Sequence, residues 1–146
     1  MSAVSSHSQE SERFRRLSAI GQIGWWEADF TTRDYLCSEY VCNLLGMKGD
    51  TLTFREFGLY IREDYRERIS REFVSIEEVE VYEQTFPILA MHGVVWVRSR
   101  LGEKWMTEDW HLKAFGILQV VDAPEQMGAT DILKQFNALL LRQHSV

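Results

Sequence analysis

The stretch from Trp26 to Phe30 alternates apolar and acidic residues, and this two-residue period constrains the fold more than any other feature of the sequence. Strict alternation predicts a β-strand with one face buried in a core and a second face in more polar surroundings. The polar residues 31–34 then predict a turn, and the short apolar stretch 35–37 predicts a second strand that pairs back on the first. The chain is therefore expected to form an antiparallel sheet early.

A short helix is expected directly after these strands. Ser38 stands at an N-cap position, and the acid that follows it lies in the first turn, where the helix dipole favours a negative charge. Val41 and Leu45 are one helical turn apart and give the helix an apolar side. Gly46 can take the left-handed conformation that ends many helices.

The rest of the chain predicts further helices followed by further strands. A helix is expected over residues 10–20, a capping box at Thr53 and Glu56 starts another, and an amphipathic helix covers 63–76. The period returns to two in three stretches, which are 79–90, 94–100 and 112–121. Together with a final apolar stripe over 130–143, this order predicts an α+β domain with a five-stranded antiparallel sheet and flanking helices at both ends.

The composition indicates one folded domain with short extensions. Hydrophobic residues make up 45% of the chain, too many for a disordered protein. The net charge of −6 speaks against a nucleic-acid surface, and no apolar run approaches the roughly 18 residues of a membrane span. We expect residues 1–9 to be disordered or non-native, 10–122 to form the domain with its N-terminal flanking helix, and 123–146 to hold a linker and the start of a C-terminal helix.

No catalytic residue, metal site or resident cofactor is expected from the side chains that could carry chemistry. His7 and His144 lie in the end segments, His92 lies in a turn, and His111 begins a strand. Cys37 and Cys42 form neither a disulfide framework nor a zinc ligand set, so we interpret them as reduced core thiols. The sequence contains no CxxC, HExxH, phosphate-binding loop or G-x-S-x-G motif.

Two carboxylates, Glu27 and Asp29, share one strand face. Such a pair can perform acid–base chemistry when a cleft buries it. The simpler interpretation is the wet face of a half-buried strand, with Arg98 and Arg100 as partners across the sheet.

The opening block resembles the start of a PAS domain, and three later segments support the resemblance. The residues that match the opening motif are Trp26, Glu27, Asp29, Phe30, Ser38, Leu44, Leu45 and Gly46. Residues 61–68 keep the register of the family's I-H-P-D-D-R-E-R segment without its His and Pro. Residues 93–100 resemble G-x-x-x-W-V-R-S-R with one residue fewer after the Gly, and residues 116–122 resemble G-x-x-Q-D-I-T with Val120 in place of the Asp.

The resemblance covers residues 10–122, and its details look most like the PAC-containing type found in bacterial sensor histidine kinases. It implies short helices on one face of the sheet and a sensory or signal-relay function in a two-component system, with output through the C-terminal helix. It also implies a cytoplasmic segment, whose parent can be membrane-anchored elsewhere. Any ligand would lie between the inner sheet face and the helices, against Trp26, Ala28, Phe30, Val41, Leu45, Phe57, Ile61 and Ile69.

The coloured cofactors of some PAS domains are not expected. Haem-binding members use a histidine on a core-facing helix, and the helix over 63–76 has none. Flavin photoreceptors carry an N-C-R-F motif, whereas here Cys42 precedes the Asn and lies on an earlier helix.

The implied partners are a second copy of the chain, the downstream kinase domains of the same protein and an unknown small molecule, without contact to nucleic acid or membrane. The candidate dimer and signalling surface consists of Phe14, Leu17, Trp25, Phe136, Leu139 and Leu140. Several Trp residues must lie on the outer sheet face, where the helix over 10–20 could cover them in cis or a partner could contact them in trans.

Two other functions remain open at this stage. The first is a ligand-free dimerisation and relay module with a fully packed core, which the large inward side chains of Trp26 and Phe30 favour. The second is a small α+β open-barrel enzyme of the ketosteroid-isomerase type, which the helix-rich middle of the chain disfavours.

Overall fold

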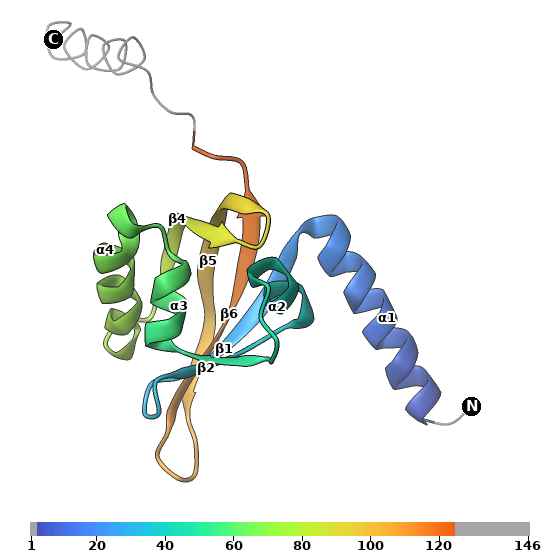
Figure 1. The fold of residues 1–146 in the computed structure, drawn as a ribbon. Coiled ribbons are helices and arrows are strands. Elements are labelled where there is room, and N and C mark those ends of the chain that lie inside the picture. The colour runs from blue at the N-terminus through green and yellow to red at the C-terminus, as the bar shows by residue number, and fades with distance from the viewer. Residues whose placement is uncertain (1–2, 125–146) are drawn as a thin grey trace, which may run out of the picture.

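The computed structural model describes residues 3–124, and within them the chain forms one antiparallel sheet of six strands with short helices (Figure 1). The strands are β1 (Ile23–Asp29), β2 (Asp34–Cys37), β3 (Thr51–Thr53), β4 (Glu83–Ala90), β5 (Gly93–Met106) and β6 (Leu112–Val121). The helices are α1 (Ala3–Gly21), α2 (Glu39–Leu45), α3 (Phe54–Tyr60), α4 (Glu63–Val74) and the 3₁₀ turn η1 (Ser75–Glu77). The strand order is β3-β2-β1-β6-β5-β4, so the first and last strands lie side by side in the middle.

The expectation of five strands is wrong by one strand. The additional strand is β3, which pairs antiparallel with β2 at the edge of the sheet. Only its middle residue, Leu52, is buried. Three residues are too short to show a period, so β3 is recognisable only from its pairing with β2.

The alternation in β1 is confirmed. Trp26, Ala28 and Phe30 are at most 5% exposed and face the core, while Glu27 and Asp29 are half-buried on the outer face. Because β1 is paired on both sides, with β2 and with β6, its register and its faces are fixed.

The expected helix ends are confirmed in position, but at one of them the side chain makes a different hydrogen bond from the one expected. Thr53 and Glu56 form the full capping box, with both hydrogen bonds at 3.0 Å. Gly46 ends α2 with φ of 74°. Ser38 stands at the N-cap of α2, but its Oγ makes no cap bond and accepts from the backbone N–H of Trp25 at 3.0 Å instead. The hydroxyl therefore extends the pairing of β1 with β2.

The connection between α3 and α4 covers part of the β4 edge. Ile61 forms an isolated bridge with Ile88, and the backbone N–H of Arg62 donates to the carbonyl of Pro87 at 3.0 Å. β4 is an edge strand of the sheet, a position in which a proline such as Pro87 is tolerated. Tyr65 in the first turn of α4 packs edge-on against Trp96, with ring centroids 5.6 Å apart.

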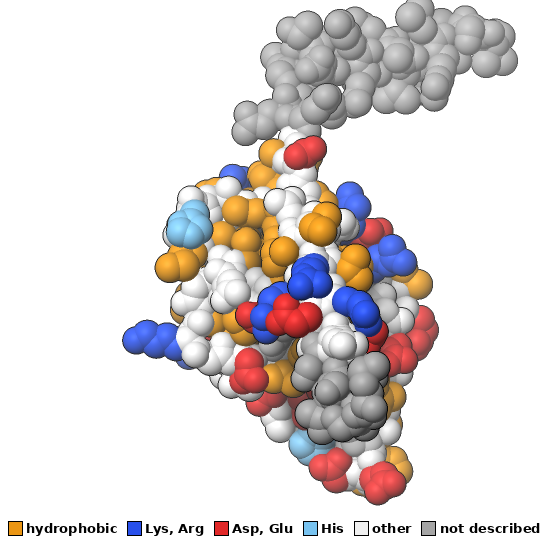
Figure 2. Space-filling view, turned by 90° about the vertical axis from the view of Figure 1, so that its right-hand side faces the viewer, with side chains coloured by type: hydrophobic (Ala, Val, Ile, Leu, Met, Phe, Trp, Pro, Cys, Tyr) orange, Lys and Arg blue, Asp and Glu red, His pale blue; other side chains and the backbone are white. Residues whose placement is uncertain are grey.

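The N-terminal helix begins at Ala3, earlier than the expected start at residue 10. It lies beside the sheet, where it contacts strand β1 and helix α2 (Figure 1). Its residues Phe14, Leu17 and Ile20 are 49%, 67% and 83% exposed, so they do not cover the outer sheet face. The view in Figure 2 looks onto this side and shows apolar side chains gathered in its upper half.

The expected C-terminal helix over 130–143, with Phe136, Leu139 and Leu140, falls outside the described residues. Among the residues that are described, no helix is both long and apolar enough to cross a membrane.

Candidate ligand-binding site

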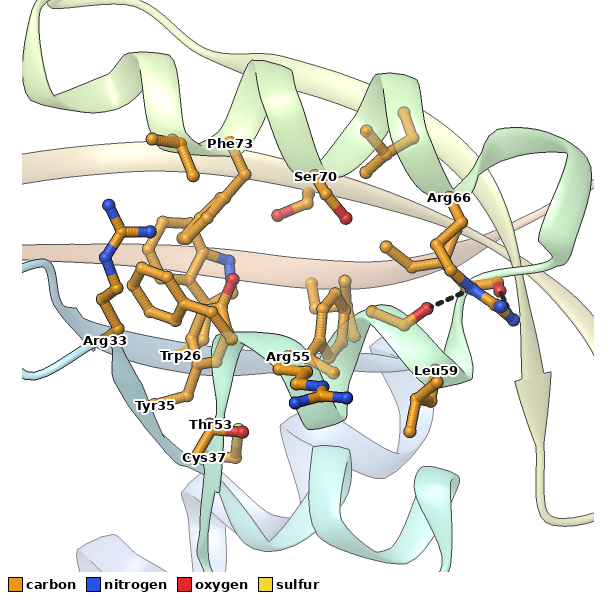
Figure 3. A pocket seen from close by; sticks show the side chains of 18 of the residues that line it. Trp26, Arg33, Tyr35, Cys37, Thr53, Arg55, Leu59, Arg66, Ser70 and Phe73 are labelled. Atoms are coloured by element: carbon orange, nitrogen blue, oxygen red, sulfur yellow. Dashed lines mark hydrogen bonds between the residues drawn. The ribbon is translucent and has the colours of Figure 1, made fainter.

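A cavity of about 640 Å³ lies between the inner face of the sheet and the helices α3 and α4 (Figure 3). Seven aromatic residues form much of its wall: Trp26, Tyr35, Phe54, Phe57, Phe73, Tyr82 and Phe86. They come from β1, β2, α3, α4 and β4 and from the residue before β4, so the fold collects them from the whole domain.

The aromatic wall is ordered by contacts among its own rings. Tyr35 packs against Phe54 and Phe73, with ring centroids 4.7 and 5.1 Å apart. Trp26 meets Phe73 edge-on at 5.5 Å, and its indole N–H donates to the carbonyl of Ile117 at 3.2 Å. Such edge-on and offset contacts stabilise aromatic pairs, so these rings are held in place rather than free to collapse into the cavity.

The interior of the cavity is uncharged at neutral pH. Burial raises the pKa of the Cys37 thiol to about 12, with smaller contributions from Cys42 and Asp50. Burial likewise raises the pKa of Tyr35 and of Tyr82 above the ordinary value for a phenol. Cys37 is therefore a neutral thiol and not a nucleophile.

Three arginines contribute to the wall, and no acidic residue does. Arg66 donates from Nε to the carbonyl of Gly58 at 2.9 Å and from Nη2 to that of Ile61 at 3.1 Å. It thereby satisfies carbonyls at the end of α3 and ties α4 to it. Because α3 packs alongside α4, the side chain of Arg66 is half-buried rather than exposed. Arg33 and Arg55 are exposed residues at the rim.

A second polar cluster lies outside the cavity, where the β1–β2 and β5–β6 turns meet. His111 Nδ1 is 2.7 Å from Asp29 Oδ2, while Asp29 Oδ1 accepts from the backbone N–H groups of Thr31 and Thr32. Burial acts to raise the pKa of Asp29, but the hydrogen bonds from His111, Thr32 and Thr31 outweigh it and lower the pKa. The same hydrogen bond to Asp29 raises the pKa of His111.

The contact between His111 and Asp29 could not be predicted from the sequence, because the two residues are 82 positions apart. The sequence also predicted arginines as partners of the outer-face carboxylates, which is wrong. Arg98 pairs with Glu83 at 3.7 Å, and Glu27 lies 3.9 Å from Lys113. Glu27 and Asp29 lie on the outer face and not in the cavity wall, so they are not placed for acid–base chemistry on a molecule held there.

Metal chemistry finds no support in the described part of the chain. No group of three or more His, Cys, Asp or Glu side chains there is arranged to hold a metal ion.

Comparison with solved structures identifies the type of fold. No family model matches the sequence, and no curated protein matches it either. Among solved structures, a sensory box histidine kinase/response regulator from Burkholderia thailandensis gives a TM-score of 0.56 at 17% identity, over 90% of this chain and 95% of that one. The N-terminal domain of a diguanylate cyclase with PAS/PAC sensor from Marinobacter aquaeolei gives 0.57 at 14% identity, over 67% and 94%. The chain has a PAS-like α+β fold.

A third neighbour with this PAS-type fold is an RNA-binding light-oxygen-voltage receptor, with a TM-score of 0.54 at 12% identity, over 82% of this chain and 35% of that one. The identities of all three are low, so they establish the architecture and not the molecule that is sensed.

Within the PAS-type fold, the residues expected at a ligand site divide into two groups. Those in the cavity wall are Trp26, Val41, Phe57, Ile61 and Ile69. Those buried in the core outside the wall are Ala28, Phe30 and Leu45. Phe30 stacks on Phe73 at 5.3 Å and so supports the wall from behind.

Other wall residues were not selected from the sequence. Phe54, Phe73 and Tyr82 carried an aromatic signal on the right elements, but the periodicity predicts only a buried side. Which buried rings border a void depends on how two helices pack on a sheet, and that is not a local property.

Proposed function

We propose that this domain is the sensory module of a bacterial two-component sensor histidine kinase and that its cavity receives a small organic molecule. The carrying observation is the cavity of about 640 Å³ with its aromatic wall. Ligand pockets in proteins span about 300–1,000 Å³ and are mostly apolar. The domain itself is a binding and relay unit, and catalysis belongs to a kinase elsewhere in the parent protein.

The cavity favours this function over a ligand-free module with a fully packed core. Trp26 and Phe30 are large and inward-facing, which had favoured the packed core. Wall atoms beside an empty space lose dispersion contacts, and this loss destabilises a fold unless something fills the space. A bound molecule would supply those contacts and would stabilise the folded domain by mass action.

Signal output follows from the position of the wall. Helices α3 and α4 form one side of the cavity and the sheet forms the other, so a molecule that enters must adjust their spacing. The central strand β6 borders the cavity through Leu118 and leads towards the C-terminal segment. We propose that this strand passes the change to the kinase of the same cytoplasmic chain, whose parent can carry a membrane anchor.

The test is a cavity-filling variant. Ser70 is on α4 and borders the cavity (Figure 3). Ser70→Phe should fill part of the space, keep the melting temperature at or above that of the wild type, and remove any small molecule found in a denatured extract by mass spectrometry. The control is Arg71→Phe at the next, exposed position, which should retain the molecule. Ligand sensing would be contradicted if cell extract left the melting temperature of the wild-type domain unchanged and mass spectrometry never found a bound compound.

A second candidate function, dimerisation, has its own observation. Phe14, Leu17 and Ile20 form an exposed apolar stripe on α1 with no partner among the described residues. Contact between such an apolar stripe and water is unfavourable, and packing against another surface lowers the free energy. We propose that α1 pairs with α1 of a second copy, in an isologous contact that the half-buried Trp25 borders on the sheet.

The variant Phe14→Glu plus Leu17→Glu should make the protein monomeric in sedimentation experiments, because it places charges in the apolar contact. Its melting temperature at low concentration should stay unchanged, since both residues are exposed. Ala19→Glu adds a negative charge at an exposed position on the opposite side of α1 and should leave the dimer intact. A wild type that stays monomeric at high concentration would remove this function.

A further inference from the structure

We propose that the molecule received by the cavity is an amphipathic organic anion, with its apolar body against the aromatic wall and its anionic group at Arg33 and Arg55. This inference rests on the proposed function, because it specifies the chemical class of the ligand for the same cavity.

The charges around the cavity have a single sign. The whole chain has more acidic than basic residues, 22 against 16. The wall reverses this balance, since it includes Arg33, Arg55 and Arg66 and contains no Asp, Glu or Lys. A cleft with one sign of charge raises the local concentration of molecules of the opposite sign. An anion is therefore attracted to the mouth, and a cation is repelled.

Two of the three arginines have free donors. The guanidinium of Arg66 is engaged by the carbonyls of Gly58 and Ile61. Arg33 and Arg55 make no ion pair with any described residue. Figure 3 shows Arg33 beside the rings of Trp26 and Phe73, and Arg55 on α3, below the cavity in this view. The guanidinium fork matches a carboxylate or another planar oxyanion and binds it with two hydrogen bonds.

Arg33 occupies a position where its side chain costs stability. Its φ is 61°, in the left-handed region where a non-glycine residue is disfavoured. Its backbone is fixed on both sides, because its N–H donates to the carbonyl of Asp29 at 2.8 Å and its carbonyl accepts from Phe54 at 3.0 Å. The turn thus holds this arginine against the start of α3, at the rim. Glycine would fit the turn better, so the structure points to a use for the guanidinium.

The volume of the cavity limits the size of the apolar part of the ligand. An apolar cavity of about 150 Å³ holds one benzene ring. At about 640 Å³, this cavity accommodates a fused-ring or long-chain body. The neutral thiol of Cys37 and the neutral phenol of Tyr35 offer such a body no charged partner in the interior. The arginines with unengaged donors are at the rim, which favours a ligand with one apolar end and one anionic end.

The experiment uses two fluorescent probes that differ by one charged group. The first is 8-anilinonaphthalene-1-sulfonate, and the second is N-phenyl-1-naphthylamine, its uncharged analogue. Both are titrated into wild type, Arg33→Gly plus Arg55→Gln, and the control Arg71→Gln, whose arginine is exposed on α4 and outside the wall. The double variant should bind the sulfonate about tenfold more weakly, the size expected for lost charge-assisted hydrogen bonds, and the neutral probe unchanged.

The outcomes separate the ligand class from the proposed function. The cavity-filled Ser70→Phe variant should bind neither probe. If Ser70→Phe blocks both probes but the two arginines do not distinguish them, the cavity is a ligand site and the anionic class is overturned. If Ser70→Phe binds both probes as well as the wild type does, the cavity is not their site and the proposed function fails with it. Thermal melts show whether each variant is folded, and Arg33→Gly is expected to melt as the wild type does.

Discussion

Replacing Trp26 by alanine is expected to lower the free energy of unfolding by about 3–5 kcal/mol, as truncations of large buried aromatic residues do. The ring is 4% exposed and packs edge-on against Tyr35 and Phe73. The indole N–H also satisfies the carbonyl of Ile117 across the β1–β6 pair. Its loss enlarges the existing cavity and removes these contacts together, so the surrounding wall cannot close over the gap. Urea denaturation followed by circular dichroism measures the change.

The adjacent tryptophan is the matched control. Trp25 lies on the outer face of β1, half-buried, and its main contact is a stacked pair with Phe115 at a centroid distance of 5.8 Å. An aromatic pair contributes about 0.5–1.5 kcal/mol beyond the area that it buries, and Trp25 is only half-buried, so Trp25→Ala should cost clearly less than Trp26→Ala. Equal losses from the two variants would mean that the faces of β1 are assigned the wrong way round.

Replacing Gly116 by alanine is expected to destabilise the domain by about 3 kcal/mol or more, at the upper end of the range for overpacked cores. Gly116 is the direct cross-strand partner of Trp26 in the β1–β6 ladder. A Cβ at this position would overlap the Trp26 ring on one side and the backbone carbonyl of Arg100 on the other. The ring can shift only by breaking its own contacts, and the carbonyl belongs to β5 and cannot move away.

Gly49→Ala is the control for Gly116→Ala, because a Cβ at Gly49 would meet no atom within 4 Å. That variant should be neutral or slightly stabilising, since alanine reduces the freedom of the unfolded chain. The double variant Trp26→Ala plus Gly116→Ala should lose less than the sum of the single losses, because removing the ring relieves one of the two overlaps. Strict additivity in that double-mutant cycle would refute the ring overlap as the cause.

Much of the fold could be predicted from local patterns. The alternation of Trp26, Ala28 and Phe30, the capping box at Thr53 and Glu56, and the limits of β6 at Leu112 and Val121 all agree with the structure. Each of these signals needs only a few neighbouring residues, because strand faces, helix caps and turns are decided by adjacent backbone geometry. The PAS-type resemblance drew on the same segments.

The candidate site was predicted less completely. The sequence identified Trp26, Ile61 and Ile69 as inward-facing, and they line the cavity. It could not identify Arg33 and Arg55 as rim residues, because an exposed arginine has no periodicity that marks its neighbours. One of its two alternatives was that the apolar side chains of α1 cover the outer sheet face, and the exposure of Leu17 shows that this side chain does not do so.

The sequence by itself determined most of the helices and strands and which face of each is apolar. The tertiary structure decided the sixth strand, the pairing of His111 with Asp29, the carbonyl partners of Arg66 and the cavity itself. The physical reason is the distance along the sequence over which each feature is decided. Local elements follow from hydrogen bonds and hydrophobic periods within a few residues, whereas a void and its charged rim arise from how distant elements fail to fill the space between them.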